Sequence, residues 1–268
     1  MKSLDERLVD VRTTLDELGT LLVKHAGIMP TVTEDQFRRS IEAAAGLQLW
    51  RELIVARDAA RAFLDGMETR ADGDDLVDFG GRRVKFAHVR LIGVGAYLSL
   101  SWSLADRISA MVGRILCTIQ GGAMNEQSPA KLVSHFVLEE RTKETTAGVA
   151  FDSVRQTFGW PIGISYAIRN HFVHDGGTQK EVEFFAGNTS AAAFQISDDG
   201  WRYAERRAHG YSVRREFSRA GNWPATPTDD LRAVLLACER EMDDALGILL
   251  GSASKALTFH VGYMLGQD

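Results

Sequence analysis

Apolar residues recur at helical spacing in two long segments near the two ends of the sequence, and this periodicity is the feature that most constrains the fold. In residues 4–25 the stripe consists of Leu4, Leu8, Val11, Leu15, Leu18 and Leu22. In the second segment, which Thr228 is expected to cap, it consists of Leu231, Val234, Leu235, Cys238, Met242, Leu246 and Leu249. A spacing of three to four residues places such side chains on one face of a helix, which must be buried against other elements. The pattern therefore predicts packed amphipathic helices.

The sequence between these segments predicts further helices. Good helix formers without proline fill residues 33–70, and apolar residues dominate residues 86–118. Shorter helices are expected around Leu132, over residues 149–158 and over residues 162–174, because Trp160 and Pro161 should end one helix and open the next. The Gly- and Asp-rich residues 71–83 read as a loop. The prediction is a mainly α chain, an up-and-down helical bundle forming a single domain over residues 1–268.

One segment departs from the helical pattern. Residues 178–224 contain short β-type runs, VEFF, AAAFQI, WRY and YSVRREF, separated by Gly, Asn and Asp-Gly turns. We expect this segment to form a small β-hairpin insertion, or β-ribbon, before the last long helix.

Composition narrows the class of protein. The chain of 268 residues is 45% hydrophobic and carries a formal net charge of −5, which is typical of a globular protein and argues against coating nucleic acid nonspecifically. Its two cysteines exclude a disulfide framework and favour a reducing compartment, so a cytoplasmic location is expected. The longest uncharged stretch, Leu91–Ala105, is shorter than the roughly 20 residues of a membrane-spanning helix. No membrane association is expected.

Chemically capable side chains gather in the segment ISYAIRNHFVHDGG. It contains Arg169, Asn170, His171 and His174 within six positions. Arginine offers a forked donor array suited to phosphate, and histidine exchanges protons near neutral pH. His174 should lie in the last turn of its helix, where the macrodipole favours the imidazolium. These residue types suffice for phosphodiester cleavage.

The segment resembles the R-x4-H signature of the HEPN superfamily, with Arg169, a polar Asn170 and then His174. HEPN domains are helical bundles, often metal-independent ribonucleases of toxin, defence and RNA-processing systems. The resemblance implies an HEPN-like bundle and an endoribonuclease, without metal or cofactor, in which Arg169 and His174 are catalytic and Asn170 assists. It also implies a homodimer that pairs two motifs, a role as a toxin or phage-defence effector, and an antitoxin or regulatory partner. Attack by the ribose 2′-hydroxyl would leave a 2′,3′-cyclic phosphate.

Two other Arg/His pairs fit similar spacings. Arg83 and His88 also stand in R-x4-H relation, but Val84 follows the arginine and the pair spans a loop-to-helix junction. Arg202 and His209 fit only a looser spacing within the expected insertion. Positions five apart on a helix lie about 140° apart, so a second chain would be needed to complete a site. We therefore interpret only the pair at 169 and 174 as the motif.

Other interpretations of the motif remain open. His171 and His174 with Asp175 could hold a metal, but no glutamate completes an H-E-x-x-H helix, so no metal site is predicted. Arg169 could pair with a carboxylate while the histidines pack. The alternatives to a nuclease are a non-catalytic HEPN module that binds nucleotide, RNA or a protein partner, and a plain helical scaffold.

The expected insertion carries a second candidate site. Residues 201–220 contain six arginines but only two glutamates, and aromatic residues are interspersed among them. Such a composition can bind phosphates and stack on bases. The alternative is an amphipathic hairpin whose aromatic residues face the bundle and whose arginines are merely solvated. The candidate RNA-binding residues are His171, Arg206, Arg207, Arg214 and Arg215.

Overall fold

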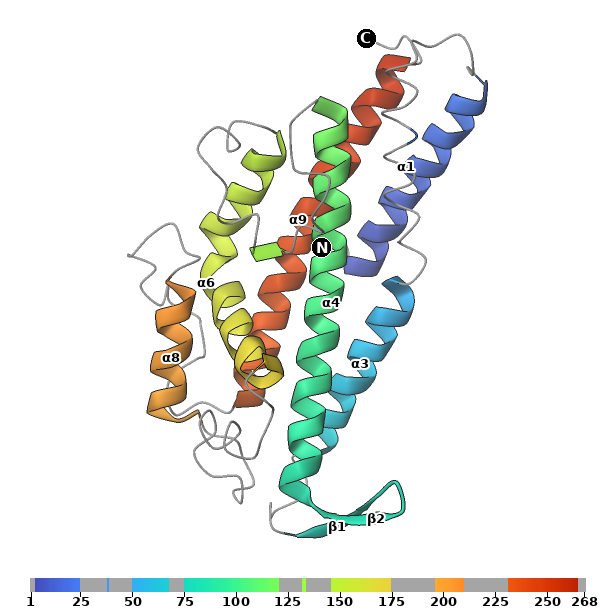
Figure 1. Cartoon of the computed structure of the whole chain (residues 1–268). Coiled ribbons are helices and arrows are strands. Elements are labelled where there is room, and N and C mark those ends of the chain that lie inside the picture. Colours follow the sequence, from blue (N-terminus) through green and yellow to red (C-terminus); the bar gives the residue numbers. More distant parts are fainter. Residues whose placement is uncertain are drawn as a thin grey trace. The chain divides into compact units, whose positions relative to one another are not determined.

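The fold is mainly helical, as predicted. A computed structural model describes residues 3–24, 38, 50–67, 75–120, 132–133, 146–174, 196–209 and 231–264. These residues form six α-helices and one two-stranded antiparallel sheet (Figure 1). None of the helices in these ranges has the length and apolarity needed to cross a membrane.

The helices predicted from the two apolar stripes are confirmed. The first is α1 (Leu4–Lys24) and the last is α9 (Leu231–Met264). All seven stripe residues of α9 are buried, as are five of the six in α1, with Leu22 outside the described side chains. Two further helices, α3 (Trp50–Met67) and α4 (Phe86–Gln120), lie within or closely match predicted segments. The 3.6-residue period of buried side chains thus explains these helices.

The chain forms two compact units, and each is considered separately. The boundaries between them fall inside α3, α4, α9 and the helix α6 (Thr146–His174). The first unit comprises Met1–Arg51, Leu104–Thr157 and Asp243–Asp268, and the second comprises Glu52–Ser103 and Phe158–Met242. The second unit contains Arg169, Asn170 and His171 of the predicted motif segment.

In the first unit, α1 is joined to α9 by a polar contact. Ser3 caps α1, because its hydroxyl accepts a hydrogen bond from the Glu6 N–H at 3.2 Å. One turn later, Arg7 Nη1 donates to the carbonyl oxygen of Gly247 in α9 at 2.9 Å. A Cβ on Gly247 would lie 3.0 Å from Arg7 Nε, so the absence of a side chain makes room for the arginine.

The core of the second unit is apolar and contains residues from α3, α4, α6, α9 and a further helix, α8 (Asp198–Ala208). Leu64, Tyr97, Ile164, Trp201 and Leu235 are representative members. Among its polar contacts, Trp102 Nε1 of α4 donates to Ser165 Oγ of α6 at 3.0 Å. The indole nitrogen is thereby satisfied, as burial requires.

Residues 76–85 form a β-hairpin, which replaces the described part of the loop expected over residues 71–83. Strand β1 (Leu76–Phe79) pairs antiparallel with β2 (Arg82–Lys85). Gly80 and Gly81 form the two-residue turn with φ of 61° and 77°, a left-handed pair typical of tight hairpins. Composition suggested a loop, but the Gly-Gly pair between two short runs is itself a hairpin signal. Partly buried Val77 and Val84 pack against the core and hold the hairpin in place.

The helix break expected at Pro161 is also wrong, because α6 continues through it as one helix. A proline removes one backbone hydrogen bond and costs roughly 3 kcal/mol or more inside a helix. Here the flanking Trp160, Ile162 and Ile164 are all buried. We attribute the continuity to this packing, which offsets the lost bond.

The run WRY, expected as part of a β-ribbon, lies instead in α8. Ser197 caps this helix, since its hydroxyl accepts from the Gly200 N–H at 3.1 Å. Trp201, Ala204 and Ala208 are buried at i, i+3 and i+7, which is a helical rather than an alternating pattern. The rest of residues 178–224, apart from 196–209, lies outside the described residues, so the β-ribbon there stays a prediction.

Candidate functional site

Two of the three predicted motif residues are in direct contact. Arg169 and Asn170 are half-buried neighbours in the last two turns of α6. Arg169 Nη1 donates a hydrogen bond to Asn170 Oδ1 at 2.9 Å. The amide oxygen thus fixes the direction of one guanidinium N–H group.

His174 is the last residue of α6, which agrees with the predicted end of this helix. Its side chain lies outside the described residues. Its backbone position is one helical turn beyond Asn170. The pairing of this imidazole with the Arg169 of a second protomer therefore stays a prediction.

Helix α8 packs against α6 in the opposite direction (Figure 1). At one end, the rings of Trp160 and His209 have centroids 4.9 Å apart. Toward the other end, His171 lies 5.3 Å from Tyr203. Between them the backbones approach closely, because a Cβ on Gly163 would lie only 2.9 Å from Ala208 Cα. The glycine therefore sets the position of α8 beside the motif helix.

Two of the predicted RNA-binding residues meet on one tyrosine. The guanidinium of Arg207 lies 5.6 Å from the centroid of the Tyr203 ring, which His171 contacts from α6. Arg206 is exposed on the same helix. Arg214 and Arg215 lie outside the described residues. The structure thus links the motif helix to the basic segment through Tyr203, a residue that sequence reasoning did not select individually.

The two other Arg/His pairs lie elsewhere. Arg83 is an exposed residue of β2, and His88 is exposed in the first turn of α4. Arg202 lies within α8 and His209 is the C-cap residue of the same helix. Arg202 Nη1 lies 4.0 Å from the Asp199 carboxylate. The first pair, on solvent-facing positions of two elements, offers a matched control for the motif.

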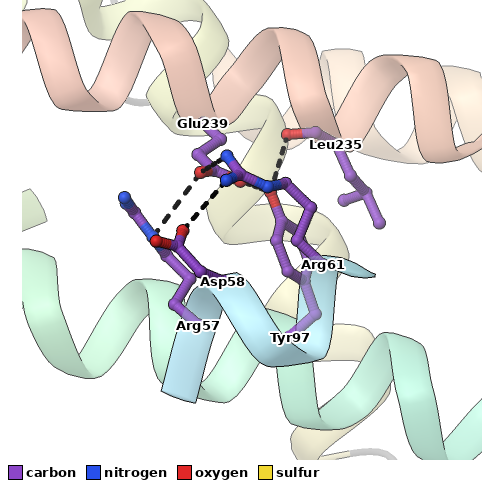
Figure 2. Close-up of polar contacts among 6 residues, drawn as sticks. All are labelled: Arg57, Asp58, Arg61, Tyr97, Leu235 and Glu239. Carbon is purple, nitrogen blue, oxygen red and sulfur yellow. Dashed lines mark hydrogen bonds and ion pairs between the residues drawn. The ribbon is translucent and has the colours of Figure 1, made fainter. Parts of the chain in front are cut away.

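A buried polar cluster, which the sequence did not reveal, joins α3, α4 and α9 (Figure 2). At its centre is Glu239, whose side chain is only 4% exposed. Arg57 Nε lies 3.5 Å from Glu239 Oε1, and the Arg57 side chain is 5% exposed. Arg61 Nη1 donates to the same oxygen at 3.0 Å, and the Tyr97 hydroxyl donates to Glu239 Oε2. The second terminal nitrogen of the Arg61 guanidinium, Nη2, lies 3.1 Å from Asp58 Oδ1.

Burial also changes the protonation chemistry of this region. Desolvation, and then the nearby negative charge of Glu239, raise the pKa of Tyr97 well above its ordinary range. Desolvation also raises the pKa of the adjacent Cys238 thiol. Tyr97 therefore stays a protonated donor, and Cys238 stays a buried thiol rather than a nucleophile. We interpret the cluster as a structural tie.

The position of Glu239 in the sequence is a signal that could have predicted this cluster. Glu239 falls within the apolar stripe of α9, beside Cys238 and one turn after Leu235. A carboxylate at such a position must be paired if it is buried. Its partners in α3 lie at least 178 positions away in the sequence, so no local pattern identifies them.

The described residues contain no group of three or more His, Cys, Asp or Glu side chains placed to hold a metal ion. Comparison of the chain with protein-family models, curated proteins and solved structures finds no match in any of the three. The functional argument therefore depends on the chemistry of α6 and α8.

Proposed function

We propose that the protein is a metal-independent endoribonuclease of HEPN type, acting as a homodimer through Arg169, Asn170 and His174. The observation that supports it is the hydrogen bond from Arg169 to Asn170 on α6, with His174 at the end of the same helix. A nuclease of this kind, working as a toxin or in phage defence, would be restrained by an antitoxin or regulatory partner.

Each residue has a distinct chemical role in the proposed reaction. The His174 imidazole accepts the proton of a ribose 2′-hydroxyl, whose oxygen attacks the adjacent phosphorus. Arg169 stabilises the negative charge that develops on the phosphoryl oxygens. Asn170 is a positioning residue, because its amide oxygen holds the Arg169 guanidinium. The motif of a second protomer supplies the acid that protonates the leaving 5′-oxygen. The products are a 2′,3′-cyclic phosphate and a 5′-hydroxyl.

The direct test uses purified wild-type protein, Arg169→Ala and His174→Ala with total RNA in excess EDTA. Arg83→Ala and His88→Ala serve as controls, because they remove the same side chains at the same spacing outside the motif. We expect cyclic phosphate ends with wild type and both controls, and none with the motif variants. Equal cleavage by all five preparations, or none by wild type, would contradict the proposal.

The homodimer is tested by mixing the two inactive variants. If each active site combines Arg169 of one protomer with His174 of the other, a mixed dimer contains one intact site. Random exchange of protomers should then restore roughly a quarter of the wild-type rate. No recovery after verified exchange would rule out a site that needs only Arg169 of one protomer and His174 of the other.

A further inference from the structure

The last turn of α8 carries two arginines that form no ion pair with a described carboxylate, although the helix as a whole has three acidic and three basic residues. Arg206 and Arg207 are both exposed in its last turn. Within the described ranges, neither forms an ion pair, whereas Arg202 lies near Asp199. A protein with a net charge of −5 needs such a local concentration of arginine to attract a polyanion.

Packing on α6 keeps these arginines directed away from the core. Trp201, Ala204 and Ala208 occupy the buried side of α8. The close approach of Ala208 to Gly163 leaves no space for a side chain between the two backbones. Because α8 cannot turn about its axis without breaking this contact, Arg206 and Arg207 have a fixed position beside α6.

Three planar side chains, from Arg207, Tyr203 and His171, lie in a row from the last turn of α8 to α6. Arg207 lies over the half-buried Tyr203 ring, and His171 of α6 contacts the same ring. Aromatic rings and guanidinium planes are the groups on which unpaired bases stack. A duplex hides its bases, so this arrangement favours a single strand.

We infer that α8 is the surface along which single-stranded RNA reaches the motif, with phosphates at Arg206 and Arg207 and a base against the planar groups around Tyr203. The inference rests on the proposed ribonuclease function. It specifies the substrate class as unpaired RNA and places its contacts outside the catalytic residues.

The test measures binding of a short fluorescent oligouridine to full-length His174→Asn protein by anisotropy over a range of salt concentrations. The added change is Arg206→Glu/Arg207→Glu. Loss of two phosphate contacts should lower the slope of log affinity against log salt by about 1.4, and affinity at 0.1 M salt roughly 25-fold. The control, Arg107→Glu/Arg114→Glu, reverses two exposed arginines of α4 and makes the same change in net charge.

Stacking is tested at Tyr203. Tyr203→Leu should weaken binding roughly tenfold, whereas Tyr203→Phe, which keeps the ring, should bind like the parent protein. A common loss in both double variants, or none in either, would overturn the inference. Preference for duplex RNA would overturn it as well.

The outcomes separate this inference from the proposed function. Cleavage in EDTA together with unchanged binding by Arg206→Glu/Arg207→Glu would remove the role of α8 and leave the nuclease intact. Salt-dependent binding through α8 without cleavage by wild type would support the binding surface and remove the catalytic proposal.

Discussion

Replacing Glu239 should be among the most destabilising single changes in the second unit. Glu239→Leu leaves Arg57, only 5% exposed, without the carboxylate that faces it at 3.5 Å. Removing one partner of a buried ion pair costs about 3–5 kcal/mol. Domains are typically stable by only about 5–15 kcal/mol, so the change should shift the unfolding transition strongly. Arg61→Met should cost at most about 1 kcal/mol, because that side chain is 40% exposed.

The double change separates a lost interaction from general damage. In Arg57→Met/Glu239→Leu neither charge of this pair is left buried without its partner, and the Tyr97 hydroxyl retains the Leu235 carbonyl oxygen at 3.5 Å. Much of the lost stability should return, giving a coupling energy of about 2 kcal/mol or more in urea unfolding followed by circular dichroism.

Glu52→Gln, a change of an exposed α3 carboxylate, is the matched control. It should alter stability by less than about 0.5 kcal/mol. If the two single changes at Arg57 and Glu239 were simply additive, or if Glu239→Leu cost no more than Glu52→Gln, the reasoning about the buried pair would be refuted.

Three further predictions follow from burial and backbone geometry. Because burial raises the pKa of Tyr97, the unfolded chain loses this proton near pH 10 while the folded chain keeps it. Stability should therefore fall by about 1.4 kcal/mol per pH unit above that point, and urea titrations of Tyr97→Phe should lack this share. Gly163→Val should cost about 1–3 kcal/mol in thermal unfolding, because its side chain would meet the α8 backbone. Gly81→Ala should cost about 1–2 kcal/mol because φ is 77°, whereas Gly66→Ala, in open space on a helix, should stabilise by up to about 1 kcal/mol. A destabilised Gly66→Ala, an unaffected Gly163→Val or an alkaline slope unchanged in Tyr97→Phe would contradict the respective argument.

Local periodicity was enough to predict much of the helical framework. The stripes from Leu4 and from Leu231 repeat over many turns, so the position of each helix is specified several times within its own segment. The same holds for α4. The wrong predictions came from residues that usually end a helix or form a loop. The structural effect of Pro161 and of the Gly80-Gly81 pair depends on the residues that surround them. Pro161 is accommodated by packing inside a helix, and the glycines form a hairpin rather than an open loop.

The site was predictable only where its residues are neighbours in sequence. Arg169 and Asn170 were selected from their spacing, and they are in contact. The pairing of His171 with Tyr203 depends on how α8 packs on α6, and a β-ribbon had been expected there. Ser197 as an N-cap and the acidic first turn of α8 are sequence signals of a helix. The run WRY was interpreted as a strand instead. Contacts of Glu239 with α3 span most of the chain and leave no local signature.

The hairpin also bears on how the protein behaves at high concentration. Among the described residues the sheet has two strands, so each strand has one edge without a strand partner, and such edges invite pairing with another chain. Strand β2 presents Arg82, Arg83 and Lys85 to solvent, and repulsion between these charges opposes alignment with a second copy. Strand β1 exposes Leu76 and Phe79 and is guarded mainly by its short length. Colloidal stability should thus depend on the strand with fewer charges, and Leu76→Glu, which places a carboxylate opposite Lys85 at an exposed position, should improve solubility.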